Sequence, residues 1–408
     1  MTMKGKTRLK WLAWAIVLPA LCLMLANTTM AAEKKEIVVG APLSLTGMFA
    51  MTGLEQRWAY EQAFAEVNKK GGILIKETGK KMPLKLVVAD DESEPAKVAA
   101  AMEKLIKMDK VDLMLSTHSG PLNVAGATVA EKYQKFYMMT TCWPFLWEPQ
   151  KFKWSALFFF DAGGGAEVPF KIWATLPEKD RPKKPALVME DSLDGKGFGE
   201  GFKAHAKKYG YTFAVDEPWA IGAKDYSSQV LKMKAAKVDA MLLFGSPTDS
   251  VTLVRQMKEN GLNVTYLHGW KGTWASEFYD ALGKDANYII CDGFWSEDYP
   301  FPGVKELAKK YNEKYKKHSV SIGAFYANAQ ILFAAIERAG SYDSAKVRDQ
   351  VFNGTFKGTV MGDLVFKPNG LALFESTASQ WWDAKQMLVY PFMKGGWKLK
   401  MMPPWGKR

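Results

Sequence analysis

A regular alternation of short apolar runs and longer amphipathic segments constrains this chain more than any other feature. Apolar runs at 37–40, 84–89, 113–115 and 136–139 are each followed by a loop, and helix-length segments separate them. The spacing of apolar residues changes from that of a strand to that of a helix and back. Strands separated by helices favour parallel pairing in one sheet that helices cover. The sequence therefore predicts an α/β fold.

The alternation restarts after an apolar run at 157–160 and a glycine-rich segment at 161–165. Further strands are expected at 186–189, 212–215, 240–244, 264–267 and 288–291. Further helices are expected at 197–208, 226–235, 248–260, 274–282, 303–317, 321–339 and 344–352. Turn-rich strands at 358–366 and a last strand at 381–390 complete the pattern. No low-complexity linker divides the chain, so we expect two α/β units joined by crossing strands.

Residues 1–32 have the pattern of a secretory signal peptide. Four basic residues precede an uncharged, mostly apolar run from Trp11 to Ala26, and small residues follow up to Ala32. The run has about 16 residues and contains Pro19, which makes it short for a membrane-spanning helix of roughly 20 residues. We expect cleavage near Ala31 or Ala32 and export to the periplasm, with a membrane anchor as the alternative.

Charge and cysteine content exclude several classes of function. The net charge is +12, or +8 without the four basic residues of the leader, and the lysines are scattered. A nucleic-acid surface would instead need clustered basic residues interleaved with aromatic ones. Outside the leader only Cys142 and Cys291 remain, too few for a disulfide framework or a metal site, although one bridge between them stays open. We expect no metal and no cofactor.

The stretch 112–133 predicts a polar pocket. An expected buried strand at 113–115 ends in a hydroxyl-rich turn at 116–119, and a helix begins at Pro121. Free backbone N–H groups and the helix dipole favour a carboxylate or phosphate at such a point. Ligands of open α/β sheets lie beyond the carboxyl ends of the strands. The turn is therefore a candidate seat for a small anion, and an ordinary loop is the alternative.

Several motifs, in chain order, resemble the branched-chain amino-acid-binding proteins, which are periplasmic receptors of ABC importers. These motifs lie at 37–47, 67–73, 194–201, 244–249 and 358–370. The resemblance implies the type I periplasmic binding fold, with two Rossmann-like lobes of parallel sheet joined by a three-crossover hinge. Lobe 1 would be 33–159 plus 292–356, and lobe 2 would be 160–291 plus 357–408. The crossovers would lie near Phe160, Cys291 and Phe356, and the ligand in the cleft between the lobes.

The resemblance also implies contact residues on the loops that face the cleft. In lobe 1 they are Ser116, Thr117, His118, Thr140, Thr141, Cys142 and Trp143. In lobe 2 they are Phe198, Ser246, Trp270 and Lys271. His118 could instead be a surface histidine, and Lys271 could instead point to solvent.

Lys271 departs from the pattern of the amino-acid binders. Those relatives carry an acidic residue near this position, which holds the ammonium of the ligand, and a lysine cannot accept a hydrogen bond from an ammonium. Trp143, Trp270, Trp274 and Trp295 fall on loops near the expected cleft or hinge, where aromatic walls could stack on a planar ligand. Core packing is the alternative for each. Together these features favour an organic anion with an apolar or aromatic body.

The sequence thus predicts a monomeric solute-binding protein that is not an enzyme. It would capture an aromatic or other apolar carboxylate and deliver it to an ABC permease in the inner membrane. Three alternatives stay open: binding of an amino acid or amide by the same fold, a ligand sensor for a membrane receptor, and an exported α/β hydrolase. The hydrolase is disfavoured because no Gly-x-Ser-x-Gly motif is present.

Overall fold

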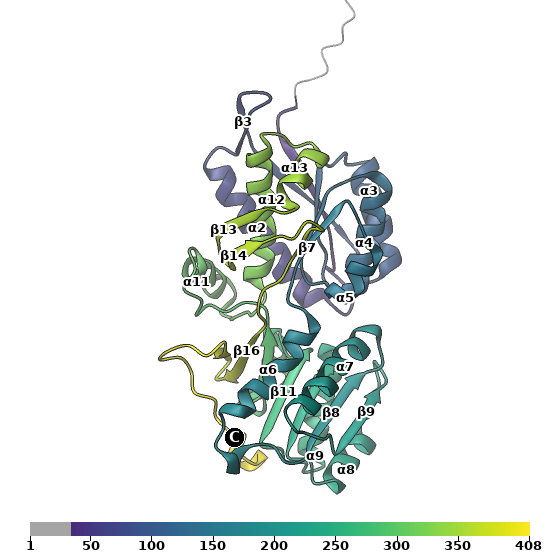
Figure 1. Ribbon diagram of the computed structural model, residues 1–408, viewed down its shortest axis with the longest axis vertical. Helices are drawn as coiled ribbons and strands as arrows, with labels where there is room; N and C mark the ends of the chain where they lie inside the picture. Colours follow the sequence, from purple (N-terminus) through teal and green to yellow (C-terminus); the bar gives the residue numbers. More distant parts are fainter. Residues whose placement is uncertain (1–33) are drawn as a thin grey trace, which may run out of the picture. The chain divides into compact units, whose positions relative to one another are not determined.

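The computed structural model describes residues 34–408, so the expected signal peptide lies outside the described residues. Residues 37–408 form one compact unit. Within it, one sheet has six strands in the order β15-β7-β6-β5-β1-β4, and another has seven in the order β17-β16-β12-β11-β10-β8-β9. We call the parts built on these sheets lobe 1 and lobe 2 (Figure 1). Across residues 34–408, no helix has the length and apolar character that a bilayer crossing needs.

Lobe 1 is built on a sheet whose five neighbouring strand pairs are all parallel. The first strands of the sheet are β1 (Ile37–Leu43), β4 (Leu84–Asp90), β5 (Leu113–Leu115), β6 (Tyr137–Met139) and β7 (Ser155–Phe158). Between β1 and β4, β2 (Ile73–Ile75) and β3 (Lys80–Met82) form a separate antiparallel pair. The helices between them are α2 (Ala50–Lys69), α3 (Pro95–Lys107), α4 (Gly120–Tyr133) and α5 (Pro144–Trp147). Helices α3 and α4 pack together on one face of the sheet, and α2 packs with α12 (Ile322–Ala339) on the other (Figure 1).

Lobe 2 repeats this arrangement and adds two antiparallel strands. Its strands are β8 (Pro185–Glu190), β9 (Val215–Trp219), β10 (Ala240–Gly245), β11 (Tyr266–Lys271), β12 (Ile290–Gly293), β16 (Thr377–Trp382) and β17 (Lys385–Tyr390). Its helices are α6 (Ala162–Thr175), α7 (Leu193–Lys208), α8 (Ser227–Ala235), α9 (Pro247–Glu259) and α10 (Ser276–Leu282). Strands β8 to β12 pair in parallel, and β16 and β17 continue the sheet in antiparallel fashion. The predicted α/β class with parallel-sheet lobes is confirmed.

The chain passes from lobe 1 to lobe 2 after β7 and returns after β12. The returning segment contains α11 (Val304–Tyr315), α12, α13 (Ser344–Val351), β13 (Thr355–Thr359), β14 (Gly362–Val365) and β15 (Leu371–Ala372). The expected third crossover near Phe356 is wrong. Strand β15 pairs in parallel with β7, and β13 packs on α12, so the chain stays in lobe 1 as far as Ala372. Burial of Leu371 and Ala372 at the sheet edge explains why this short segment remains there.

Two further segments differ from the sequence-based expectation. The single strand expected at 381–390 is the second half of the β16–β17 hairpin, because Asp383 and Ala384 both adopt positive φ and turn the chain. Helix α6 was not expected, because glycine is a poor helix former. Its first turn is capped by Asp161, whose Oδ1 accepts a hydrogen bond from Gly164 N at 2.7 Å, and the helix packs along α7.

Candidate functional site

A small pocket lies between loops of the two lobes. Its lining residues are His118, Ser119, Gly120, Thr141, Trp143, Phe159, Asp194, Lys271 and Trp274. The first six follow strands β5, β6 and β7 of lobe 1, and the other three follow β8 and β11 of lobe 2. Carboxyl ends of parallel strands therefore meet here from both sheets, which is the position where open α/β sheets bind ligands. The cavity measures about 20 Å³, enough for one water molecule.

The N-terminus of α4 forms the backbone part of the lobe 1 side. Ser119 has a φ of 80°, which turns the chain into the helix, and Pro121 occupies the first helical turn. Within residues 34–408, the backbone N–H groups of Ser119 and Gly120 donate no hydrogen bond. A Cβ at Gly120 would lie 2.7 Å from Leu146 Cδ1 and 3.3 Å from Asp194 Oδ1, so glycine permits the close approach of lobe 2. The arrangement offers N–H donors and a positive dipole end to an anion.

A buried hydrogen-bond network behind the pocket holds the two lobe 1 loops. Asn123 Nδ2 donates to Thr117 O and to Thr140 O, both at 3.0 Å. Asn328 Nδ2 donates to Ser116 Oγ at 3.2 Å, and Thr117 Oγ1 donates a short hydrogen bond to Asp91. The hydroxyls of Ser116 and Thr117 are therefore engaged inside lobe 1, and neither residue lines the pocket.

His118 lies in the pocket wall rather than on the surface. Its ring is 5.4 Å from that of Phe49, 6.1 Å from that of Trp274 and 6.2 Å from that of Phe325, measured between centroids. Burial, and then the charge of Lys271, lower the pKa of His118 to about 3. Its buried Nδ1 has no hydrogen-bond partner among the described residues. The imidazole is thus neutral at ordinary pH and can donate or accept one hydrogen bond without adding charge.

Aromatic rings from both lobes form the apolar wall. The ring centroid of Trp143 lies 5.2 Å from that of Phe159 and 5.1 Å from that of Phe198, which belongs to lobe 2. Trp274 packs edge-on against Phe294 at 5.2 Å. These rings present flat apolar surfaces that can pack on a hydrocarbon or aromatic group.

Charged side chains form the lobe 2 side. Lys271 Nζ lies 2.6 Å from Glu190 Oε1 and 3.7 Å from Asp194 Oδ2, and also 5.6 Å from the ring centroid of Phe49 across the cleft. The Lys271 side chain is 12% exposed, which excludes the solvent-facing alternative. Glu190 Oε2 and Asp194 Oδ1 are buried and have no partner among the described residues. Burial raises the pKa of Asp194, and Lys271 opposes that rise.

The acidic residue of the amino-acid binders is replaced at the Lys271 position, as the sequence indicates, but two other carboxylates lie beside Lys271. The carboxylates come from the end of β8 (Glu190) and the first turn of α7 (Asp194), whereas Lys271 is the last residue of β11. Strands β8 and β11 both pair with β10, so their carboxyl ends lie two strands apart in the sheet. For this reason Asp194 and Glu190, which are 77 and 81 positions from Lys271 in the sequence, lie beside it in the structure. In the amino-acid binders the acidic residue lies near the position of Lys271. Here the carboxylates beside Lys271 belong to Glu190 and Asp194.

Of the eleven predicted contact residues, four line the pocket: His118, Thr141, Trp143 and Lys271. Behind the loops, Ser116, Thr117, Thr140 and Cys142 are buried. Phe198 touches Trp143 from lobe 2, Ser246 Oγ donates to Asp249 Oδ2 at 2.7 Å, and Trp270 stacks on His268 at 3.9 Å inside lobe 2.

Sequence reasoning missed four lining residues as contacts: Ser119, Gly120, Phe159 and Asp194. A helix that opens with Gly-Pro was a usable signal for Ser119 and Gly120, because that turn exposes backbone N–H groups. Asp194 belongs to the motif at 194–201, in which Phe198 is the one residue that the resemblance predicts as a ligand contact. No local signal distinguishes Asp194 from the exposed Asp191 three positions earlier.

Cys142 and Cys291 are both free and buried, so the bridge left open by the sequence is not formed. Burial raises the pKa of both thiols. In the part of the chain that the structure describes, no cluster of histidine, cysteine and acidic side chains could hold a metal ion.

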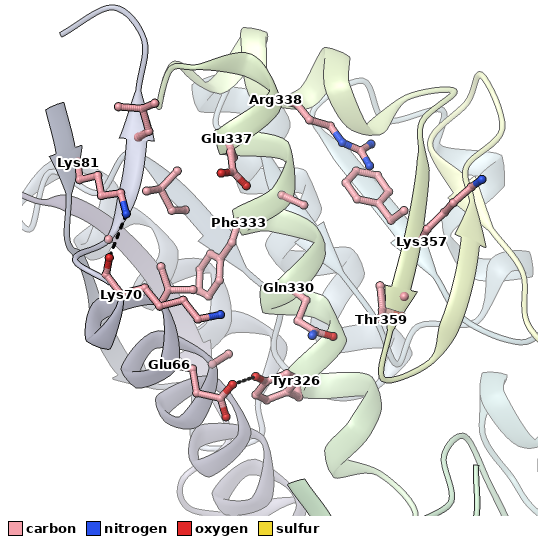
Figure 2. A pocket seen from close by; sticks show the side chains of 18 residues that line it. Glu66, Lys70, Lys81, Tyr326, Gln330, Phe333, Glu337, Arg338, Lys357 and Thr359 are labelled. Atoms are coloured by element: carbon pink, nitrogen blue, oxygen red, sulfur yellow. Dashed lines mark hydrogen bonds between the residues drawn. The ribbon is translucent and has the colours of Figure 1, made fainter. Parts of the chain in front are cut away.

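A larger hollow of about 500 Å³ lies on lobe 1 alone, between α2, α12 and β13 (Figure 2). Two of its charged side chains have partners within the hollow: Tyr326 Oη donates to Glu66 Oε2 at 2.7 Å, and Lys81 Nζ donates to Lys70 O at 3.1 Å. The guanidinium of Arg338 stacks 4.2 Å from the ring centroid of Phe356. We take the inter-lobe pocket as the candidate site because it joins both lobes and contains buried polar atoms that lack partners.

Comparisons with known proteins identify the family of this chain. The family model described as periplasmic binding protein matches residues 36–381. A Leu/Ile/Val-binding protein of Rhizobium johnstonii is 26% identical over 356 residues, covering 87% of this chain and 94% of the relative. The substrate-binding protein LivJ of Streptococcus pneumoniae, solved with isoleucine, is similar with a TM-score of 0.76 and 21% identity, over 88% of this chain and 100% of that one.

Another solved structure with a similar fold holds a different kind of ligand. It is a solute-binding protein of an ABC transporter from Rhodopseudomonas palustris BisB5, in complex with 3,4-dihydroxybenzoic acid. The TM-score is 0.72 at 18% identity, over 86% of this chain and 95% of that one. At these identities the two solved structures bear on the fold alone.

Proposed function

Since this chain belongs to the periplasmic binding protein family, as its motifs predict, we propose that it is the exported substrate-binding component of an ABC importer and captures a small carboxylate with an apolar or aromatic body. The observation that carries the proposal is the composition of the inter-lobe pocket. Unpaired backbone N–H groups of α4 lie on one side, Lys271 with its partners Glu190 and Asp194 lies on the other, and aromatic rings line the space between them. The closed protein then delivers its ligand to a permease in the inner membrane.

Capture follows from the geometry. The carboxylate would accept hydrogen bonds from the N–H groups of Ser119 and Gly120, and the apolar body would pack on Trp143 and Trp274. A cavity of about 20 Å³ is far smaller than such a ligand, so the lobes must separate to admit it. The chain passes between the sheets after β7, after β12 and after β15, and these three segments are the natural hinge for that motion.

An amino acid is the second candidate ligand, and one observation favours it. Two buried carboxylates surround one ammonium in the lobe 2 cluster, and one oxygen of each has no partner. A buried carboxylate oxygen without a donor is costly, so a ligand that brings its own ammonium would satisfy it. The Leu/Ile/Val-binding relative from Rhizobium johnstonii supports this alternative.

Matched ligand pairs separate the two candidates. Calorimetry on protein that has been unfolded and refolded to remove bound ligand would compare 3-phenylpropanoate with phenylalanine, and 4-methylpentanoate with leucine. We expect micromolar or tighter binding of at least one amine-free acid, and binding of its amino acid at least about tenfold weaker, a difference of about 1.4 kcal/mol. The opposite ranking would establish the amino-acid candidate. Absence of binding by every member of the panel would refute both.

A charge-removing substitution adds a second test. In Asp194→Asn, the affinity for an amine-free acid should stay or rise, whereas the affinity for an amino acid should fall at least about tenfold, because a charged hydrogen bond is lost. Asp191→Asn is the matched control, since Asp191 lies three positions earlier, just before α7, but is 56% exposed and paired with Lys196. An equal effect of the two substitutions would place Asp194 outside the ligand site.

A further inference from the structure

The loop after β17, residues 391–396, presents two apolar side chains to solvent. Phe392 is 55% exposed and Met393 is 39% exposed. Among the large apolar side chains exposed anywhere in residues 34–408, these two alone are neighbours in the chain. Single exposed apolar residues are common on soluble proteins, but contiguous ones mark interaction sites.

Both ends of this loop are fastened to lobe 2. Before it, Lys171 Nζ donates to Tyr390 Oη at 3.1 Å, and Tyr390 Oη donates a short hydrogen bond to Glu375. After it, Trp397 Nε1 donates to Gln380 Oε1 at 3.1 Å. The loop therefore extends from a fixed base beside the β16–β17 hairpin (Figure 1). The exposed apolar side chains therefore lie on a loop that is held at both ends and not on a loose end of the chain.

Every charged residue from 385 to the C-terminus is basic. These residues are Lys385, Lys394, Lys398, Lys400, Lys407 and Arg408. Lys394 and Lys398 are exposed next to the apolar tip. Lys400 Nζ lies 3.3 Å from the ring centroid of Trp382 and 4.5 Å from that of Trp397, so an ammonium and two indoles share one surface at the loop base.

We propose that this loop, with the basic and indole groups at its base, docks the protein on an anionic phospholipid surface. Phe392 and Met393 would enter the boundary between headgroups and acyl chains, where apolar side chains gain most. Lys394 and Lys398 would meet lipid phosphates, and Trp382 and Trp397 would lie at headgroup depth, where indoles are enriched. None of the residues that line the inter-lobe pocket belongs to the loop, so docking and ligand capture use separate surfaces.

The charge pattern favours a lipid surface over a protein partner. A convex tip with cations on one side needs only a deformable, negatively charged plane, and a protein partner would need a matching acidic groove. The attraction would be weak and reversible, because one short apolar insertion with a few lysines is at the low end of membrane anchoring. Such an interaction would concentrate the receptor near the bilayer without tethering it there.

Vesicle co-sedimentation tests the proposal on the exported chain. We expect at least about fivefold more pelleting with phosphatidylcholine vesicles that contain phosphatidylglycerol than with pure phosphatidylcholine, and less pelleting at high salt because salt screens the attraction. The double variant Phe392→Ser with Met393→Ser should lose at least about two-thirds of the pelleted fraction. Leu231→Ser is the matched control, since Leu231 is 52% exposed on α8, far from the loop in sequence.

Folding of each variant is checked by its thermal melting curve, which should match that of the parent. Equal pelleting of the loop variant and the parent would overturn the proposal and assign the attraction to the scattered lysines. Absence of pelleting with either vesicle would overturn it as well. Loop-dependent binding to the purified permease in detergent, without binding to anionic vesicles, would assign the loop to a protein partner instead.

Discussion

The two sides of the inter-lobe pocket differ in how they are held. On the lobe 1 side, the amides of Gln56, Asn123 and Asn328 donate to carbonyls and hydroxyls of the loops behind the pocket. On the lobe 2 side, Lys271 is packed between Glu190 and Asp194, and one oxygen of each carboxylate is unpaired. Both sides keep unpaired buried atoms, among them Gln56 Oε1 and Asn328 Oδ1 on the lobe 1 side. The difference is that neutral amides hold the lobe 1 loops, whereas charged side chains hold the lobe 2 side.

This difference assigns distinct roles to the two lobes. A neutral network loses little on burial and keeps the loops rigid, so lobe 1 offers a preformed set of backbone N–H groups. A buried cluster of charges depends strongly on the charge of whatever approaches it. We infer that lobe 1 positions a carboxylate and that lobe 2 decides which charged groups the rest of the ligand can carry.

The largest expected effect comes from breaking the charged side. Lys271→Met leaves two buried carboxylates without their cation and should lower the free energy of unfolding by about 3–5 kcal/mol, measured by urea denaturation without ligand. Adding Glu190→Gln should recover much of that loss, because one of the uncompensated charges is removed. A Lys271→Met variant as stable as the parent would show that the cluster is not held by charge.

The neutral side should be the next most sensitive. Asn123→Ala removes the donor to Thr117 O and Thr140 O, and also the acceptor for Tyr137 Oη, so it should cost about 2–3 kcal/mol. Gln150→Ala, which truncates an exposed amide, should stay within about 0.5 kcal/mol in the same urea experiment. Similar losses in both variants would contradict the role given to the buried network.

Ligand affinity should depend on pH through lobe 2 and not through lobe 1. The pKa of Asp194 is raised by burial, so falling pH protonates it and takes the cluster from a net charge of −1 toward neutrality. Affinity for an amine-free carboxylate should rise several-fold as the pH falls toward the raised pKa of Asp194, measured by calorimetry over a range of pH values. Asp194→Asn should flatten this profile.

His118→Gln should leave the pH profile unchanged, because the pKa of His118 is lowered to about 3 and the ring stays neutral over that range. The raised pKa of Asp194 also makes the free energy of unfolding depend on pH. The folded chain holds the Asp194 proton more tightly than the unfolded chain, so the stabilising contribution of Asp194 is complete at low pH and lost as pH rises through its folded pKa. If His118→Gln removed the pH dependence of ligand affinity, the pH-sensitive group would lie in lobe 1, and the roles given to the two lobes would be wrong.

The smallest expected effect concerns Ser116. Its hydroxyl accepts from Asn328 and from Thr140 N, so Ser116→Ala should cost about 1 kcal/mol of stability and change ligand affinity less than about twofold. Thr141→Val, which alters a pocket-lining hydroxyl, should weaken ligand binding more in the same calorimetric titration. A tenfold loss of affinity in Ser116→Ala would restore the ligand contact that the sequence motif predicts.

Local patterns were sufficient for the fold class, and they pointed to one of the turns that line the inter-lobe pocket. Alternating strand and helix periods predicted parallel sheets, and the hydroxyl-rich turn at 116–119 before Pro121 predicted a polar pocket at a turn whose His118 and Ser119 line the inter-lobe pocket. These features can be read locally, because burial sets the period of each element and the chain itself places a loop at the end of each strand.

Only the tertiary structure decided which side chains face the pocket and which charges surround Lys271. Ser116 and Trp270 point into their own lobes, a matter of strand pleat and packing that adjacent residues do not reveal. Glu190 and Asp194 reach Lys271 because β8 and β11 both pair with β10, and the pairing of strands depends on the whole sheet. The sequence predicted that Lys271 faces an anionic ligand. Because of the strand order, Lys271 instead lies beside the buried carboxylates of Glu190 and Asp194.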